Sequence, residues 1–248
     1  DIETMKKLGF NGVRKHIKVE PSRWYYWCDK LGLMVWQDMP SANSYLDGKD
    51  REKPVAVDKP QYKAELINMV RSNWNHPSII MWVVFNEEQG QHDTDSLAAE
   101  VKGLDPTRLL NPASGTTVWG KVHDTKSGDV MDVHIYPGPS SPTPTAERVA
   151  VLGEFGGLGF PVEGHKWSKN VWGYKNSADP KTWISEYEKL LAKTWELKDQ
   201  PGLSGAIYTQ LTDVESEGNG LVTYDREVIK LDLERAKAAN TGKPPVQP

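Results

Sequence analysis

The sequence predicts an α/β barrel, and three observations support this fold class. The chain has 248 residues, close to the ~250 residues of a typical (β/α)₈ barrel. Short apolar runs alternate with longer segments of helical periodicity, which is typical of repeated β/α units. Several of these runs are almost continuously apolar, as expected for parallel strands that are covered on both faces. We therefore expect one barrel domain over residues 1–240 and a short tail over 241–248.

Seven strands are predicted from the apolar runs. They span residues 12–17, 33–38, 79–86, 109–113, 130–135, 149–154 and 203–208. Helices are predicted between and after them, over residues 21–31, 62–73, 94–104, 180–198 and 226–239. Two long segments, 40–60 and 156–179, are predicted as loops that follow strand ends, where barrel enzymes build their sites.

The first residues indicate a fragment of a longer chain. Ile2, Met5 and Leu8 have helical spacing and Gly9 ends the pattern, so a helix is already under way at the start. A closed barrel needs eight strands, and we expect the first to lie upstream of Asp1. An open barrel exposes unpaired strand edges, so we expect them to be covered by preceding domains, a partner chain such as a second copy, a swapped segment or a rearranged sheet.

Composition excludes several classes of protein. The hydrophobic content of 38% and charged content of 26% are typical of a folded globular protein. No apolar run reaches the ~20 residues of a membrane helix, and the net charge of −4 gives no footprint for nucleic acid. The lone Cys28 excludes a disulfide framework within the chain. The sequence does not assign a cellular location, and a periplasmic or extracellular one is preferred.

Carboxylates at the ends of two buried strands point to chemistry. The run SIIMWVVFNEEQG delivers Asn86, Glu87 and Glu88, and the run RVAVLGEFGGLG delivers Glu154. A carboxylate near a core is costly, and a barrel brings its strand ends to one face. Two facing carboxylates are what glycoside hydrolysis needs, one protonated and one ionised. The alternative is that each carboxylate caps a strand or pairs with Arg14 or His134.

Sequence motifs in the same order along the chain resemble glycoside hydrolase family 2. They are DIETMKKLGFNGVRKH, WYYWCDKLGLMVWQDMP, NHPSIIMWVVFNEEQG, DPTRLLNPASG, DVHIYPG, VLGEFGG and GLVTYDRE. The family includes β-galactosidases, β-glucuronidases and β-mannosidases. The resemblance implies a TIM barrel, here without its first strand, preceded in the family by β-sandwich domains.

The resemblance also implies roles for individual residues. Glu87 would be the acid/base, Asn86 the ligand of the sugar 2-hydroxyl and Glu154 the nucleophile. Further residues would contact the nucleophile or the sugar, namely Arg14, Tyr136, Trp36, Asp38 and His134, although His134 could equally be a core residue. Glu88 competes with Glu87, but neighbouring strand residues point to opposite faces, and the family motif selects Glu87.

The implied reaction is retaining hydrolysis of a terminal β-linked sugar in an oligo- or polysaccharide. Glu154 would form a covalent glycosyl-enzyme and Glu87 would protonate the leaving oxygen. In this mechanism the two carboxyl groups stand ~5–5.5 Å apart. The resemblance implies no cofactor, and no metal is expected because the Glu-x-His of metal-binding galactosidases is absent.

The sugar itself stays open between three activities. EGNGLVTYDRE contains Asn219 but lacks the lysine with which the family's glucuronidases bind a uronic acid. VWQD resembles the β-mannosidase sequence, and the family's strand-eight tryptophan is replaced within AIYTQLTD, so Tyr208 or Gln210 would form the pocket floor. A β-galactosidase is preferred as the family's commonest activity, with β-mannosidase and β-glucuronidase as alternatives.

Two hypotheses of other functional classes follow from the same residues. The chain could be a catalytically inactive barrel that binds carbohydrate without cleaving it. A metallohydrolase using His92, His123, His134 or His165 is disfavoured, because no HExxH or comparable ligand spacing links these histidines.

Overall fold

The computed structural model describes residues 1–41, 57–116 and 124–243, and the chain forms two compact units. We call residues 12–133 and 144–150 the strand-rich unit. Residues 1–11, 134–143 and 151–248 form the other unit, which we call the C-terminal unit. No helix among the described residues has both the length and the apolar character needed to cross a membrane.

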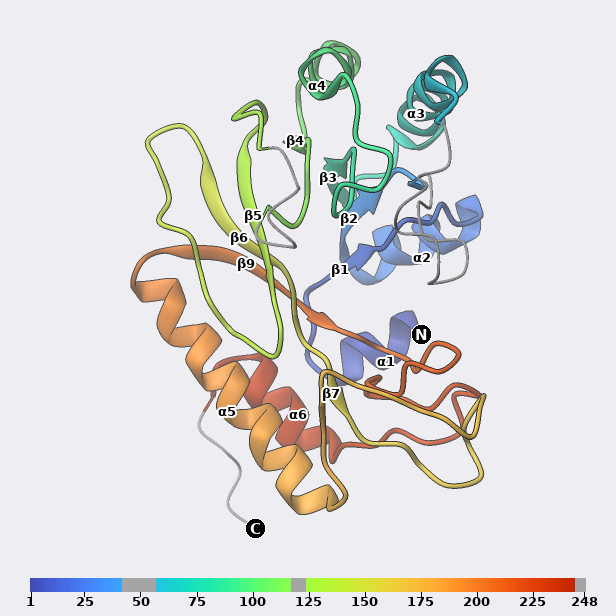
Figure 1. The fold of residues 1–248 in the computed structure, drawn as a ribbon, viewed down its shortest axis with the longest axis vertical. Helices are drawn as coiled ribbons and strands as arrows, with labels where there is room; N and C mark the ends of the chain where they lie inside the picture. Colours follow the sequence, from blue (N-terminus) through green and yellow to red (C-terminus); the bar gives the residue numbers. More distant parts are fainter. Residues whose placement is uncertain (42–56, 117–123, 244–248) are drawn as a thin grey trace. The chain divides into compact units, whose positions relative to one another are not determined.

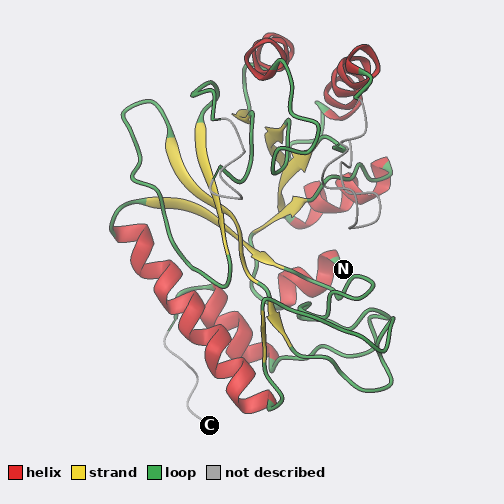
Figure 2. Ribbon diagram, viewed as in Figure 1, coloured by secondary structure: helices red, strands yellow, loops and turns green. Residues whose placement is uncertain are grey.

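The strand-rich unit is built on a parallel four-stranded sheet (Figures 1 and 2). Its strands are β1 (Gly12–Lys15), β2 (Met34–Asp38), β3 (Ile79–Val83) and β4 (Leu109–Asn111), in that spatial order. Between consecutive strands lie α2 (Ser22–Leu31), α3 (Lys59–Asn73) and α4 (Thr94–Leu104). Because the strands are parallel, their carboxyl ends meet at one edge of the sheet.

Local chemistry explains where these helices begin and end. Asp58 accepts a hydrogen bond from the Gln61 N–H at 3.0 Å, and Pro60 occupies the first turn of α3, which are both favourable at a helix start. α2 ends at Gly32, whose φ of 65° lies in the left-handed region, where glycine has no steric penalty. The Trp82 indole N–H donates to Asp105 at 3.0 Å and joins β3 to the end of α4.

The C-terminal unit is organised around three helices. They are α1 (Ile2–Lys7), α5 (Pro180–Asp199) and α6 (Leu233–Asn240). Asn240 links them, because its side-chain amide donates to the Leu8 carbonyl at 2.8 Å and accepts from the Tyr187 hydroxyl at 2.6 Å. A short parallel pair, β7 (Leu158–Gly159) and β8 (Lys175–Asn176), lies in the same unit.

A second sheet has the strand order β5-β6-β9. Its members are β5 (Val130–Ile135), β6 (Val149–Gly156) and β9 (Leu203–Thr209). With the first sheet, these strands occupy all seven positions predicted from the apolar runs, and α4 has the predicted bounds.

Several predicted boundaries differ from the structure. α6 begins at Leu233 rather than residue 226, because Arg226 has a φ of 67° and Asp232 caps the helix. The predicted loop 156–179 contains β7 and β8. The predicted loop 40–60 ends earlier, since α3 starts at Lys59. Residues 42–56 of this loop lie outside the described part of the chain, and so do residues 244–248 of the predicted tail.

Candidate active site

In the strand-rich unit, Arg14 connects the ends of three neighbouring strands. Its Nε lies 3.0 and 3.1 Å from the two carboxylate oxygens of Asp38, and its Nη2 lies 2.8 Å from Asp38 Oδ2. The same Nη2 donates to Asn86 Oδ1 at 2.8 Å. All three side chains are buried. The bidentate ion pair fixes the guanidinium, and the guanidinium in turn orients the Asn86 amide with its NH₂ group turned away from Arg14.

Arg14→Met is expected to lower the free energy of unfolding by about 3–5 kcal/mol, because it leaves the buried Asp38 carboxylate without its partner. Urea denaturation of the chain measures this loss. Arg235→Met is the matched control, since Arg235 forms a similar bidentate pair with Glu188 in a more exposed place. That control should cost about 0–1 kcal/mol. Equal losses of unfolding free energy in the two variants would show that the buried ion pair stabilises the fold no more than the exposed one.

Trp36 and Asp38 lie on the same face of β2, two residues apart, and both are buried. Trp36 is in register with Arg14 on β1 and Met81 on β3. Gln37 points the other way, as strand alternation requires, and accepts a hydrogen bond from the Tyr25 hydroxyl of α2 at 2.6 Å. The predicted sugar-subsite residues Trp36 and Asp38 therefore share the face that carries Arg14's ion pair.

Glu87 and Glu88 lie in a turn after β3, not on the strand. β3 ends at Val83, and the two glutamates have φ values of 45° and 65°. The Gln89 N–H donates to the Asn86 carbonyl at 2.9 Å and closes the turn. Our argument that alternation along a strand separates Glu87 from Glu88 is therefore wrong, because left-handed backbone does not follow that alternation.

Ser114 and Asp132 hold the backbone of this turn. The Glu87 N–H donates to the Ser114 carbonyl at 3.0 Å, and the Ser114 N–H donates to the Phe85 carbonyl at 2.9 Å. Asp132 Oδ2 accepts from the Ser114 hydroxyl and from the Asn111 side-chain amide, each at 2.7 Å. Sequence analysis missed these buried polar residues, although both lie in the quoted motifs DVHIYPG and DPTRLLNPASG.

In the C-terminal unit, Glu154 on β6 is contacted by two predicted site residues. The Tyr136 hydroxyl donates to Glu154 Oε2 at 2.7 Å, and His134 Nδ1 lies 3.4 Å from the same oxygen. Burial and the Glu154 charge raise the pKa of Tyr136 far above its usual range, so Tyr136 stays a protonated donor. A hydrogen bond to the charged form stabilises an ionised carboxylate.

The residues at the end of β9 have different surroundings. Thr209 Oγ1 lies 2.8 Å from the Tyr136 hydroxyl. Gln210 Nε2 donates to Asn219 Oδ1 at 2.8 Å, and Asn219 Nδ2 donates to Glu217 Oε1 at 2.9 Å. Tyr208 instead lies in the core: its buried ring packs on Phe155 and Tyr187. The prediction that Tyr208 or Gln210 forms the pocket floor stays a prediction for both residues.

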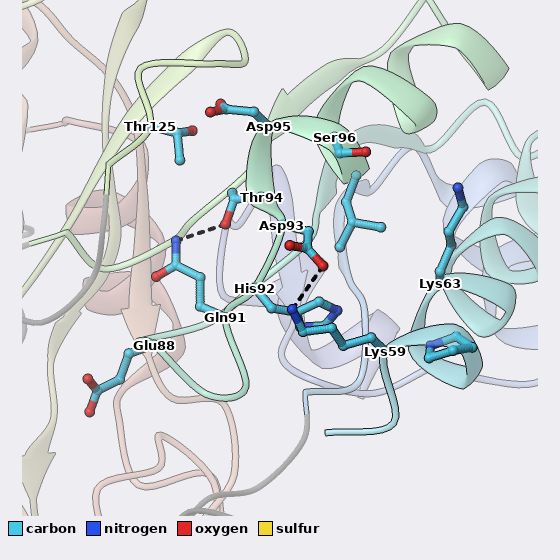
Figure 3. Close-up of a pocket in the computed structure, with 12 residues that line it drawn as sticks. Lys59, Lys63, Glu88, Gln91, His92, Asp93, Thr94, Asp95, Ser96 and Thr125 are labelled. Atoms are coloured by element: carbon cyan, nitrogen blue, oxygen red, sulfur yellow. Dashed lines mark hydrogen bonds and ion pairs between the residues drawn. The ribbon is translucent and has the colours of Figure 1, made fainter. Parts of the chain in front are cut away.

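An open hollow of about 1020 Å³ lies in the strand-rich unit between the starts of α3 and α4 (Figure 3). Its lining is of mixed charge: Lys59 pairs with Asp93 at 3.1 Å, and Gln91 donates to Thr94 at 3.2 Å. Glu88 is among the lining residues, whereas Glu87 is not. The two neighbouring glutamates therefore differ in their surroundings.

The histidines weighed for a metallohydrolase have separate partners. His92 Nδ1 contacts the Gly90 carbonyl at 2.7 Å in the strand-rich unit. In the C-terminal unit, His165 Nδ1 lies 2.7 Å from Asp225, and His134 contacts Glu154. His123 lies outside the described residues.

Comparison with known proteins decides the family. The model of the glycosyl hydrolases family 2 TIM barrel domain matches residues 1–229. The chain belongs to glycoside hydrolase family 2. The predicted barrel fold is thereby confirmed, and so is the resemblance drawn from the sequence motifs.

Relatives within family 2 carry two different activities in their names. A β-galactosidase of Halalkalibacterium halodurans is 26% identical over 252 residues, which cover 92% of this chain and 23% of the relative. A β-glucuronidase of Bacteroides fragilis is 31% identical over 121 residues, covering 46% of this chain and 17% of the relative. The chain thus spans less than a quarter of these curated relatives.

A solved family 2 structure confirms the fold across almost the whole chain. It is a β-galacturonidase from Eisenbergiella tayi bound to galacturonate, with a TM-score of 0.71 and 18% sequence identity. The match covers 98% of this chain and 47% of that structure.

Proposed function

We propose that this chain is the catalytic barrel of a retaining exo-β-glycosidase that uses Glu154 as nucleophile and Glu87 as acid/base. The observation that carries the proposal is the hydrogen bond from Tyr136 to Glu154 Oε2 in a member of family 2. A neutral hydrogen-bond donor favours the charged form of a carboxylate, and a nucleophile at the anomeric carbon must be charged.

The first half of the reaction forms a glycosyl ester. A Glu154 oxygen attacks the anomeric carbon while the bond from that carbon to the leaving oxygen breaks. Glu87 gives its proton to the leaving oxygen. The Asn86 amide, oriented by Arg14 at 2.8 Å, would donate to the 2-hydroxyl of the sugar, where hydrogen bonds strengthen in the transition state.

The second half of the reaction releases the sugar. Ionised Glu87 takes a proton from water as the water oxygen attacks the anomeric carbon, and the ester bond to Glu154 breaks. Two inversions at one carbon give net retention. No step in this sequence calls for a metal or a cofactor.

The sugar we propose is a terminal β-galactoside. The H. halodurans relative, named a β-galactosidase, matches 92% of the chain. Asn219 is not followed two residues later by the lysine of the glucuronidase sequence. A β-glucuronide or a β-mannoside is the alternative.

Proton NMR during hydrolysis of 4-nitrophenyl β-galactoside, β-glucuronide and β-mannoside tests the proposal. The first sugar released should be the β anomer, which then mutarotates. Release of the α anomer would contradict the retaining mechanism. Binding of galactose without turnover of any of the three substrates would instead favour the inactive carbohydrate-binding barrel.

A further inference from the structure

A third carboxylate, Glu217, is held in a defined position in the C-terminal unit. Its Oε1 accepts from Asn219 Nδ2 at 2.9 Å. Its backbone N–H donates to the Val214 carbonyl at 2.8 Å, and its carbonyl accepts from the Val214 N–H at 3.0 Å. The neighbouring Ser216 and Gly218 each exchange a hydrogen bond with the backbone of Trp172, at 2.9 and 2.8 Å. Both the main chain and the side chain of Glu217 are therefore fixed.

Glu217 lies within electrostatic range of the proposed nucleophile. Burial raises the pKa of Glu217, the Asn219 hydrogen bond opposes this, and the Glu154 charge raises the pKa further. Hydrogen bonds also connect the two: Glu154 contacts Tyr136 and Tyr136 contacts Thr209. The next residue, Gln210, donates to Asn219, the partner of Glu217.

The Asn219 amide is already occupied by these neighbours. Its oxygen accepts from Gln210 and its nitrogen donates to Glu217, and the residue is fully buried. A cation close by, Lys230, has its ammonium group buried and 2.6 Å from Asp213. Asp213 therefore compensates the charge of Lys230, whose Nζ also lies 3.5 Å from the Gly218 carbonyl next to Glu217.

We propose that Glu217 determines specificity by excluding sugars that carry a carboxylate, so that the substrate is a neutral glycoside rather than a uronide. This inference rests on the proposed function and narrows its substrate class. A second anion bound near a partly buried carboxylate meets repulsion that water screens poorly.

Glu217→Gln tests the proposal, because glutamine keeps the acceptor for Asn219 and removes the charge. The readout is kcat/KM for 4-nitrophenyl β-galactoside and β-galacturonide, which differ at C6 only. The chain should prefer the galactoside, and the variant should shift the ratio toward the galacturonide by roughly 10- to 100-fold. Glu215→Gln, an exposed glutamate two residues away, is the matched control and should leave the ratio unchanged.

Acidic pH supplies a second readout. Protonation of Glu217 removes its charge. As pH falls, the ratio of kcat/KM for the galacturonide to that for the galactoside should therefore rise in the unsubstituted chain but not in Glu217→Gln. An unchanged ratio in Glu217→Gln, with the galactoside still cleaved, would overturn the role of Glu217 and leave the proposed function intact.

Calorimetric binding keeps the two proposals distinguishable. If neither glycoside is cleaved, the proposed function fails, and titration with galactose and galacturonate decides the role of Glu217. Galactose should bind more tightly than galacturonate, and the difference between the two affinities should be smaller in Glu217→Gln. Equal binding of the two sugars by the unsubstituted chain, or binding of neither, would contradict the specificity proposal.

Discussion

Glu154→Gln is expected to lower kcat for 4-nitrophenyl β-galactoside by about 10⁴-fold or more, the scale seen when an enzyme loses its nucleophile. The amide has nearly the same shape and still accepts a hydrogen bond from Tyr136, but it cannot form a glycosyl ester. Steady-state kinetics measures the loss. Circular dichroism and urea denaturation establish that the variant is folded.

Glu163→Gln is the matched control for this substitution. Glu163 lies in the same unit, and its exposed side chain pairs with Lys166 on the surface. Its replacement should leave kcat within twofold of the unsubstituted chain. Substantial activity in Glu154→Gln would exclude Glu154 as the nucleophile.

Glu87→Gln should have the second largest effect, and its size should depend on the leaving group. General acid catalysis contributes roughly 10²–10⁴-fold, so an alkyl galactoside, whose leaving oxygen needs a proton, should lose about that much. Formation of the glycosyl ester from 2,4-dinitrophenyl β-galactoside should be nearly unaffected, because this leaving group departs without a proton. Burst and steady-state kinetics separate the two steps.

Azide provides a sharper test of the same residue. It needs no general base, so it should accelerate release of the sugar from Glu87→Gln and give β-galactosyl azide. Glu88→Gln is the control, because Glu88 follows in the same turn but lines the neighbouring hollow. Loss of activity in Glu88→Gln with azide rescue there, and none in Glu87→Gln, would reassign the acid/base.

Features that depend on buried strands could be predicted from the sequence. A run such as IIMWV is apolar without alternation because both faces of β3 are covered. Once the strands are parallel, their carboxyl ends must share an edge, and this brings Arg14, Asp38 and Asn86 together. The contact of Tyr136 with Glu154 was likewise expected from the family resemblance and is present at 2.7 Å.

What the sequence could not predict depends on backbone geometry and on polar contacts between distant residues. Glu87 and Glu88 have left-handed φ values although neither is a glycine, and only the structure shows this. Asp132 stands 18 residues from Ser114, and only the folded chain shows their hydrogen bond. Glu217 is one of two acids in VESEGNG, and its orientation by Asn219 appears only in the structure.

Mass spectrometry of the chain after incubation with 2-deoxy-2-fluoro-β-galactosyl fluoride tests the proposed nucleophile most directly. The fluorine slows hydrolysis of the glycosyl ester, so the covalent intermediate accumulates. We predict that one fluorosugar is attached, that peptide mapping places it on Glu154, and that Glu154→Gln stays unlabelled. Attachment of the fluorosugar to another carboxylate, together with release of the hydrolysis product as the α anomer, would contradict the mechanism proposed for this barrel.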